Sequence, residues 1–240
     1  MLYSENAIRE FKNMSFFYTV KDEAVAELTE KKSRFIATVR PVSGEEEALS
    51  FIQELKKKYW DARHNCSAYV ILEGQPSGQD GIMKFATREK ANDDGEPSKT
   101  AGAPILEAIK GAELKNVAIV VTRYFGGILL GTGGLVRAYS GAAVLGIEAA
   151  EKVKMELLNK ISVTVDYNSF GRLKNLTENI GAVIRDNEYT DNVNVICLCN
   201  DDSYNVICSR MNEATAGKCK IELIEKNYYS LSEKTGKNGL

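Results

Sequence analysis

Apolar residues recur with a strand-like period along the first part of the chain. Short runs rich in β-branched and aromatic residues predict strands at residues 16–20, 25–29, 33–42, 65–72 and 84–88. The run at 117–121 is apolar without interruption, which is typical of a strand buried on both faces. These patterns predict a β-sheet in the first half of the chain.

The stretch 43–59 has a helical period instead. Ser43 and Glu46 predict a capping box, and the apolar stripe is Ala48, Phe51, Ile52, Leu55 and Tyr59. Acids gather in its first turn and Lys56, Lys57 and Lys58 in its last. The helix dipole explains both charge runs, and contact between the lysines and a nucleic acid is the alternative.

The pattern restarts near residues 153–159 and then follows a different order. The predicted elements are a strand at 161–167, a helix around 170–180, strands at 182–189 and 192–199, a helix capped by Asp201 or Asp202, and a strand at 220–228. This βαββαβ order is that of a ferredoxin-like domain. We therefore predict an α+β protein with domains at 16–155 and 158–230.

Composition excludes several classes of protein. The 240 residues have 44% hydrophobic and 27% charged side chains and a net charge of −2, typical of a globular protein. This charge excludes a protein that coats nucleic acid by bulk attraction, although a local basic patch remains open. No apolar stretch is long enough to span a membrane, and residues 1–15 do not resemble a secretory signal, so a cytoplasmic location is expected.

The pattern of cysteine and histidine does not favour a structural zinc site. The five cysteines are odd in number and form no CxxC pair, and the chain has one histidine. His64 and Cys66 lie two residues apart on a predicted strand, so their side chains share a face. They are either a nucleophile and base or a satisfied histidine beside a buried cysteine.

A glycine-rich stretch, NVAIVVTRYFGGILLGTGGLVR at 116–137, stands out from the rest of the chain. The predicted strand ends at Arg123, Tyr124 and Phe125, and a helix is predicted to begin near Leu135. The glycines between them are Gly126, Gly127, Gly131, Gly133 and Gly134. Such density requires either unusual backbone geometry or close approach of another group.

The two common phosphate-binding motifs do not fit this stretch. A P-loop needs lysine where Thr132 stands, and a dinucleotide fingerprint needs glycine where Val136 stands. Two explanations remain open. The loop and helix N-terminus bind an anion together with Arg123 and Arg137, or the glycines allow tight packing of helix on sheet.

An acidic turn, Asp93-Asp94-Gly95-Glu96, precedes the predicted helix that contains Pro104, with Ser98 or Thr100 as its cap. Three carboxylates in four residues suit a hard cation such as Mg²⁺. A second explanation is a turn that caps a helix. A third is that these acids form ion pairs with Arg123 or Arg137 and thereby rigidify the loop. These alternatives stay open at the level of sequence.

Two segments carry a family resemblance. DDGEPSKTAGAPIL and NVAIVVTRYFGGILLGTGGLVRAYSGAA together resemble the IMPACT family, specifically its bacterial YigZ-like branch. His64-x-Cys66-x-Ala68 is also similar to the family, so the motifs cover roughly residues 64–143. No common generic motif reproduces them.

The resemblance implies a fold and a biological context. The first domain would be similar to domain IV of elongation factor G and to the second domain of a small-subunit ribosomal protein, with a β-sheet layered on two or more helices. The second would be similar to domain V of elongation factor G. The family is not established as enzymatic. Its bacterial members have been suggested to bind nucleic acid, and its eukaryotic relatives regulate translation initiation by competing for the activator of a starvation-sensing kinase. The family usually has a small residue where this chain has Lys99.

The leading hypothesis is a non-enzymatic protein that binds RNA, the ribosome or a translation factor and is linked to regulation of translation. Anion or nucleic-acid contacts are assigned to Lys99, Arg123, Arg137, Gly126, Gly127, Gly131, Gly133 and Gly134. The same surface would contain His64, Asp93, Asp94, Glu96, Tyr124 and Phe125. One alternative is an enzyme acting on a phosphorylated substrate with a divalent metal at residues 93–96; another is a pure protein–protein adaptor. No resident metal, cofactor or nucleotide is expected in the leading hypothesis.

Overall fold

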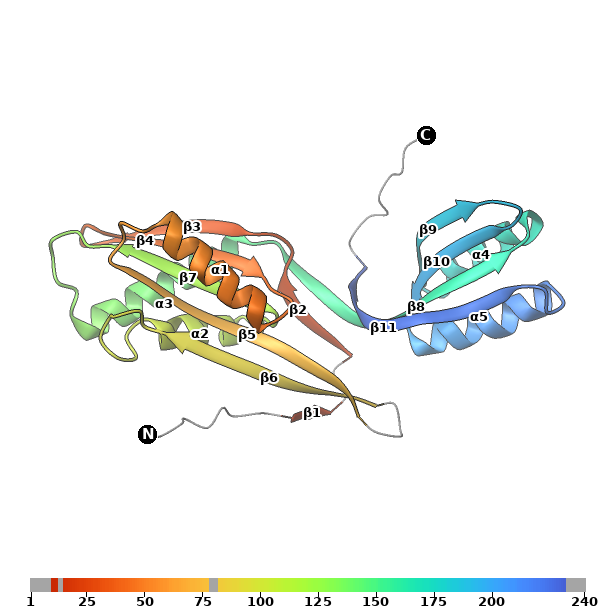
Figure 1. Ribbon diagram of the computed structural model, residues 1–240, viewed down its shortest axis with the longest axis horizontal. Coiled ribbons are helices and arrows are strands. Elements are labelled where there is room, and N and C mark those ends of the chain that lie inside the picture. Colours follow the sequence, from red (N-terminus) through yellow and green to blue (C-terminus); the bar gives the residue numbers. More distant parts are fainter. Residues whose placement is uncertain (1–9, 13–14, 78–81, 232–240) are drawn as a thin grey trace. The chain divides into compact units, whose positions relative to one another are not determined.

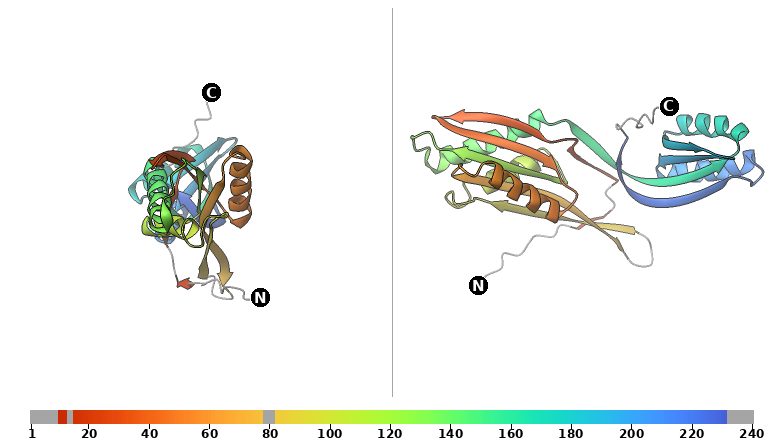
Figure 2. Two further views of the ribbon diagram at one scale, coloured as in Figure 1. Left: turned by 90° about the vertical axis from the view of Figure 1, so that its left-hand side faces the viewer. Right: turned by 45° about the horizontal axis from the view of Figure 1, so that its top comes forward.

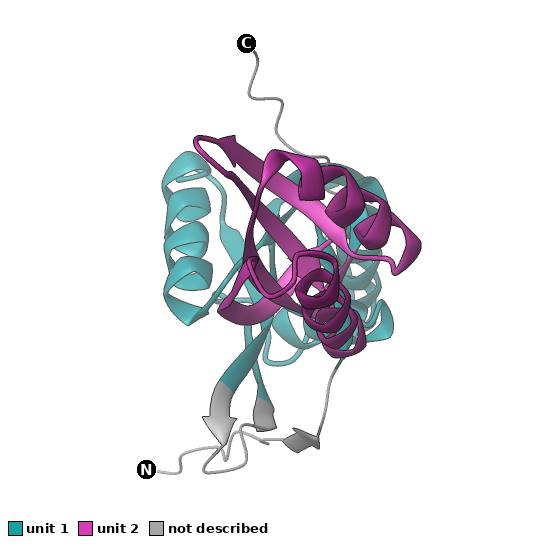
Figure 3. Cartoon of the chain, turned by 90° about the vertical axis from the view of Figure 1, so that its right-hand side faces the viewer, with its two compact units in different colours: residues 1–153 teal, residues 154–240 magenta. Residues whose placement is uncertain are grey.

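A computed structural model describes residues 10–12, 15–77 and 82–231 of the chain. The chain divides into two compact units, residues 1–153 and 154–240, each with its own hydrophobic core (Figure 3). No helix among the described residues is long and apolar enough to cross a membrane.

Unit 1 is built on a six-stranded antiparallel sheet (Figure 1). In spatial order its strands are β1 (Glu10–Lys12), β6 (Ile82–Asn92), β5 (His64–Ser77), β7 (Val117–Tyr124), β4 (Ser33–Pro41) and β3 (Ala24–Glu30). Strand β2 (Phe16–Val20) lies outside this sheet and forms a parallel bridge between Tyr18 and Leu114. The central strand β7 is buried along almost its whole length, as its unbroken apolar run predicts.

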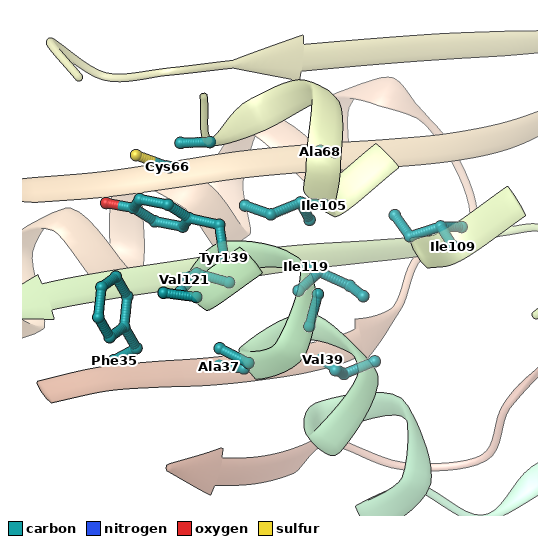
Figure 4. Close-up of a cluster of buried hydrophobic side chains, with 14 of the residues drawn as sticks. Phe35, Ala37, Val39, Cys66, Ala68, Ile105, Ile109, Ile119, Val121 and Tyr139 are labelled. Atoms are coloured by element: carbon teal, nitrogen blue, oxygen red, sulfur yellow. The ribbon is translucent and has the colours of Figure 1, made fainter. Parts of the chain in front are cut away.

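Helices cover both faces of this sheet (Figure 2). Helix α1 (Glu45–Lys58) packs Phe51 and Leu55 against one face, where Val120 is also buried. Helices α2 (Gly102–Gly111) and α3 (Gly131–Ala149) cover the other face. The close-up in Figure 4 shows their side chains meeting the sheet, among them Ile105, Ile109 and Tyr139 against Ala68, Ile119 and Val121. The expectation of two or more helices on one face is confirmed, and α1 adds a third helix on the opposite face.

The start of α1 differs from the predicted capping box. The backbone N–H and the hydroxyl of Ser43 both donate to Glu47 Oε2 at 2.7 Å, so the pairing is with Glu47 and not with Glu46. Gly44 is the residue before the helix and makes no side-chain cap. Glu47, four residues after Ser43, therefore takes the role that the predicted capping box gave to Glu46.

Helices α2 and α3 also begin elsewhere than predicted. Neither Ser98 nor Thr100 caps α2. Ala101 precedes the helix, and Asp93 accepts the backbone N–H groups of Ala101 and Gly102 at the helix start. Helix α3 begins at Gly131, four residues before the predicted start near Leu135. Glycine is a poor helix former, so the sequence predicts a loop here, but tertiary packing overrides so weak a preference.

The hairpin of β5 and β6 is longer than the sequence predicts. The strands predicted at 65–72 and 84–88 are both longer in the structure: β5 continues to Ser77 and β6 begins at Ile82. Residues 78–81 lie outside the described part of the chain.

Unit 2 has the ferredoxin-like arrangement that the pattern predicts. Its elements are β8 (Lys152–Val165), α4 (Tyr167–Asn179), β9 (Val183–Tyr189), β10 (Val193–Cys199), α5 (Asp201–Ala214) and β11 (Lys220–Ser230). The strand order is β11-β8-β10-β9, and the core contains Ile161, Leu173 and Ile207. Helix α5 is capped by Asn200, whose Oδ1 accepts from Ser203 N, and not by Asp201 or Asp202.

Candidate functional site

Four connections converge at one end of unit 1, which we call the loop end: residues 30–33, 59–63, 93–101 and 125–130. Figure 1 shows it on the left, where β5 begins and β6 and β7 end. Side chains at the ends of α1 and β7 contact two of these connections: Lys56 Nζ lies 2.5 Å from Asp94 Oδ1, and the hydroxyl of Tyr124 donates to Asp61 at 2.8 Å. The fold thus gathers the acidic turn and the glycine-rich stretch into one region.

Asp93 organises the turn from within. Its carboxylate accepts backbone N–H groups from Lys99 at 2.8 Å, Ala101 at 3.0 Å and Gly102 at 2.8 Å. Two of these donors belong to the start of α2, where a negative charge is favoured by the helix dipole. Asp93 is therefore the remote cap of α2, one of the roles that the sequence left open for the acidic turn.

Asp94 ties the turn to the neighbouring elements. One oxygen contacts Lys56 at the end of α1, and the other accepts the backbone N–H of Asn65 at 2.7 Å. Asp94 itself has a positive φ of 43°, a conformation that aspartate tolerates better than most residues. Its contacts hold the turn against the start of β5.

Glu96 forms a buried ion pair with Arg123. The carboxylate oxygen Oε1 lies 2.5 Å from the guanidinium and also accepts the hydroxyl of Tyr139 at 2.8 Å. Arg123 is only 6% exposed, and its guanidinium lies over the rings of Phe35 and Phe125. This is the loop-rigidifying pair that the sequence offered as an alternative.

The burial of Arg123 corrects its assignment as a surface contact for an anion. Its guanidinium is committed to Glu96 and to two aromatic faces, and its charge is neutralised within the protein. Arg137, by contrast, is exposed and has no ion-pair partner among the described residues. Of the two arginines that bracket the glycine-rich stretch, Arg137 is the one that faces solvent.

His64 and Cys66 face the acidic turn but do not form a nucleophile and base pair. His64 Nδ1 lies 2.8 Å from the carbonyl oxygen of Asp94, and Cys66 Sγ donates to the carbonyl of Asp93 at 3.0 Å. Burial raises the pKa of Cys66 to about 12, so the thiol stays protonated at neutral pH. An activated nucleophile needs the opposite shift.

The metal hypothesis for residues 93–96 finds no support in the geometry. Asp93 accepts backbone groups, Asp94 contacts a lysine and a backbone amide, and Glu96 is paired with an arginine. The three carboxylates therefore point to different partners. Among the described residues, no group of three His, Cys, Asp or Glu side chains is arranged to hold a metal ion.

The glycines serve different purposes. A Cβ on Gly126 would lie 2.0 Å from the backbone of Lys32, so this position requires close approach. Gly127 and Gly131 have positive φ angles of 84° and 70°, which side chains rarely adopt. Gly133 and Gly134 lie in the first turn of α3, and Gly134 is buried against Leu130. Tight packing therefore accounts for Gly126 and Gly134.

The N-terminus of α3 remains open to an anion. Its first turn contains no acidic residue and its start has no side-chain cap. Gly131 and Gly133 are exposed there, and Arg137 follows in the next turn. Unsatisfied N–H groups and the positive end of a helix dipole attract negative charge at such a place.

Lys99 has a positive φ of 61° and an exposed side chain. Glycine adopts this conformation without strain because it has no Cβ, so the lysine occupies a position whose backbone favours glycine. In this chain the lysine adds a cation to the loop end. Its backbone N–H still donates to Asp93.

Further residues of the loop end were missed at the level of sequence. Lys31 and Lys32 join β3 to β4, and Arg63 precedes β5; all three are exposed. Trp60 is 82% exposed and Leu129 is 83% exposed. A tryptophan in a charged context, KKKYWDAR, is a signal that could have pointed to this place.

Comparisons with known proteins agree with the division of the chain. A model of the Impact N-terminal domain matches residues 31–147, and a domain of unknown function, DUF1949, matches residues 163–218. The chain is 41% identical over 212 residues to the IMPACT family member YvyE of Bacillus subtilis, covering 88% of this chain and 93% of that protein. It is 34% identical over 159 residues to the IMPACT family member YigZ of Escherichia coli, covering 66% of this chain and 74% of the relative.

A solved structure supports the two-unit architecture. The crystal structure of a hypothetical protein is 27% identical to this chain, with a TM-score of 0.54. The similarity covers 90% of this chain and all of that one.

Proposed function

Because the chain belongs to the IMPACT family, we propose that it is a non-enzymatic binding protein whose loop end contacts RNA, alone or within the ribosome. The resemblance to the bacterial YigZ-like branch is confirmed by these relatives. The proposal assigns the contacts to exposed cations of unit 1 and to the N-terminus of α3. It involves no resident cofactor.

The observation that carries the proposal is the charge of the loop end. The chain as a whole has a net charge of −2. Cations at this end are nevertheless exposed and have no ion-pair partner within the described part of the chain: Lys31, Lys32, Lys57, Lys58, Arg63, Lys99 and Arg137. The acids nearby are mostly used internally, as Asp93, Asp94 and Glu96 show. The exposed surface is therefore basic, and phosphates are its natural counterions.

The start of α3 adds a place for one phosphate. Exposed Gly131 and Gly133 bring backbone amides to the surface without covering side chains, and Arg137 lies one turn further on. Helix N-termini bind phosphate through such amides. In the proposal this turn positions the RNA backbone, and the surrounding lysines supply affinity without sequence preference.

The link to translation rests on the family. The resemblance implies that eukaryotic relatives regulate translation initiation, and that both domains are similar to domains of a translation factor. We propose that this chain acts in the same context, on the ribosome or on a translation factor. This part of the proposal comes from membership of the family, and the contacts described above support only the binding surface.

An RNA-binding titration with charge reversal tests the proposal. The triple variant Lys32→Glu/Arg63→Glu/Arg137→Glu removes three unpaired cations of the loop end. We expect wild-type binding of transfer or ribosomal RNA to weaken steeply with salt, and the triple variant to reduce the slope of log K against log salt by about 2 to 3. Fluorescence anisotropy of labelled RNA at several salt concentrations measures both quantities.

A matched control separates the surface from bulk charge. Lys174→Glu/Arg210→Glu/Lys218→Glu makes the same change of net charge with exposed cations of unit 2. We expect this control to bind nearly as well as the wild type. Equal losses in the two variants, or no binding by the wild type at low salt, would contradict the proposal.

A protein–protein adaptor is the second candidate, and one observation favours it. The connection of β7 to α3 exposes Phe125, Ile128 and Leu129, the last by 83%. Exposed apolar side chains on a rigid loop are typical of protein-binding anchors. Loss of a host protein from pull-downs with Leu129→Ser, while RNA binding persists, would support this function.

A further inference from the structure

Trp60 is placed where tryptophan is rarely found. It is the only tryptophan of the chain and is 82% exposed, although tryptophan is on average among the most buried residues. No other large hydrophobic side chain that the structure describes is more exposed, apart from Leu129. An aromatic face of this size in water is available to a partner.

The loop that carries Trp60 is anchored on both sides. Tyr59 N–H donates to Leu55 O at 2.9 Å and continues the hydrogen bonding of α1, and Ala62 N–H donates to Tyr59 O at 3.0 Å. Asp61 accepts the hydroxyl of Tyr124 at 2.8 Å, which ties the loop to the end of β7. Trp60 therefore projects from a turn held by its neighbours, which reduces the entropy lost when a partner binds.

Cations outnumber acids in the sequence around Trp60. Lys57 and Lys58 precede it and Arg63 follows it; all three are exposed, and none has an ion-pair partner among the described residues. The nearest acid in sequence, Asp61, already accepts the Tyr124 hydroxyl. A flat aromatic face bordered by unpaired cations matches a ligand that offers both phosphates and π-faces.

We propose that Trp60 stacks on an unpaired base of single-stranded RNA, while Lys57, Lys58 and Arg63 contact the flanking phosphates. The inference rests on the proposed function and narrows its ligand to RNA with accessible bases, because bases within a duplex are stacked on each other. A protein partner is disfavoured at this place, since the core of a protein–protein interface is normally depleted of charged residues, lysine among them. Here Lys57 and Lys58 lie three and two residues before the tryptophan.

The single tryptophan makes the test direct. An unstructured RNA of about 20 nucleotides, longer than one binding site, is titrated into the protein, and the same strand annealed to its complement serves as the duplex. Anisotropy of the labelled strands reports binding, and tryptophan emission reports stacking on Trp60 alone. We expect both forms to bind and only the single strand to quench the emission.

Substitution of Trp60 gives the second readout. Trp60→Ala should weaken binding of the single strand by about 5- to 150-fold, the effect of losing one base–aromatic stack, and leave duplex binding unchanged. Trp60→Phe keeps an aromatic face and should retain most of the affinity. Because the side chain is exposed, the circular dichroism of both variants should match that of the wild type.

The outcomes separate the inference from the function on which it rests. Either of two results overturns the stacking role and leaves RNA binding intact: the wild type binds both RNA forms without quenching of its emission by the single strand, or Trp60→Ala binds the single strand as tightly as the wild type does. An equal loss for both RNA forms in Trp60→Ala also overturns it. Absence of any RNA binding by the wild type overturns the proposed function and the inference together. Retention of a host protein by the wild type but not by Trp60→Ala, with RNA binding unchanged, assigns Trp60 to a protein partner and overturns the inference.

Discussion

At the scale of single residues, burial decides what the charged side chains of the loop end do. Arg123 and Arg137 bracket the same glycine-rich stretch, yet one is enclosed with Glu96 and the other faces solvent. A buried guanidinium that lacks its carboxylate is costly, so Glu96 and Arg123 depend on each other. Arg137 has no such constraint and is free to bind an external anion.

The Glu96–Arg123 pair gives a prediction on stability. Glu96→Gln leaves the buried guanidinium of Arg123 without its charge partner, so we expect unfolding in urea to require about 3 to 5 kcal/mol less free energy. Replacing both residues, as in Glu96→Leu/Arg123→Met, should restore part of the loss because no unpaired charge remains.

The control for this prediction is the exposed pair of Glu27 and Arg34. Glu27→Gln should have a much smaller effect on the urea midpoint, because solvent screens that pair. Equal effects of Glu96→Gln and Glu27→Gln would show that the loop-end pair is not enclosed.

Cys66 gives a prediction on pH dependence. Burial raises its pKa to about 12 from an ordinary value of 9.0. The unfolded chain therefore releases this proton at lower pH than the folded chain does. The contribution of the protonated thiol to the free energy of unfolding is fully present below about pH 9 and is lost as the pH rises toward 12. The contribution is about 1.4 kcal/mol per pH unit in that window.

Cys66→Ala isolates this effect from other alkaline titrations. Its unfolding free energy should fall less steeply than that of the wild type between pH 9 and 12, measured by urea denaturation at each pH. Parallel curves for the two proteins would mean that the native thiol ionises as readily as the unfolded one.

At the scale of elements, the glycine-rich stretch combines three separate requirements. Gly126 approaches the backbone of Lys32, Gly127 and Gly131 adopt positive φ, and Gly133 lies in the first turn of a helix. The many glycines of this stretch suggest one ligand-binding loop, but they have separate structural reasons: a close backbone contact, two positive φ angles and a position in the first turn of a helix. Only the start of α3, which contains Gly131 and Gly133, remains a candidate for anion binding.

Alanine substitutions distinguish these roles. Gly126→Ala places a Cβ 2.0 Å from the backbone of Lys32 and should destabilise the protein by about 1 to 3 kcal/mol or more, because no side chain there can move aside. Gly133→Ala meets only the end of Arg137 at 3.7 Å and should stabilise α3 by about 0.5 kcal/mol. Thermal unfolding of the two variants beside the wild type measures both, and a stable Gly126→Ala would refute the close contact.

At the scale of the whole molecule, the two units have separate hydrophobic cores. Leu173 is fully buried among residues of unit 2, and Ile119 is fully buried in unit 1. We expect Leu173→Ala to lower the stability of its unit by about 2 to 5 kcal/mol and to leave the other unit protected.

Native-state hydrogen exchange followed by mass spectrometry measures this difference. Leu173→Ala should accelerate exchange in peptides from β10 and α4, and Ile119→Ala should do the same for peptides from β5 and β7. Acceleration of every peptide by either variant would show that the chain unfolds as one cooperative body.

Much of the fold was predictable because it depends on local pattern. The unbroken run at 117–121 predicted a strand covered on both faces, and the order of periods after residue 160 predicted the ferredoxin-like unit. Helix starts were less predictable. The cap of α2 is Asp93, eight residues before Ala101, because the chain folds back through the acidic turn. The start of α3 was not predictable because glycine has a low helix propensity, which tertiary packing overrides at this place.

The sequence by itself determined the family, the β-sheet of the first unit, the ferredoxin-like arrangement of the second, and the presence of a glycine-rich and an acidic segment. Only the tertiary structure decided which charges face solvent. Glu96, Arg123 and Tyr139 meet from three different elements, and no spacing along the chain reveals that contact. The reason is physical: periodicity reports interactions between near neighbours in sequence, whereas burial of an ion pair depends on groups brought together by the fold. Arg123 is enclosed by that burial, whereas Trp60 and the cations near it in sequence are exposed.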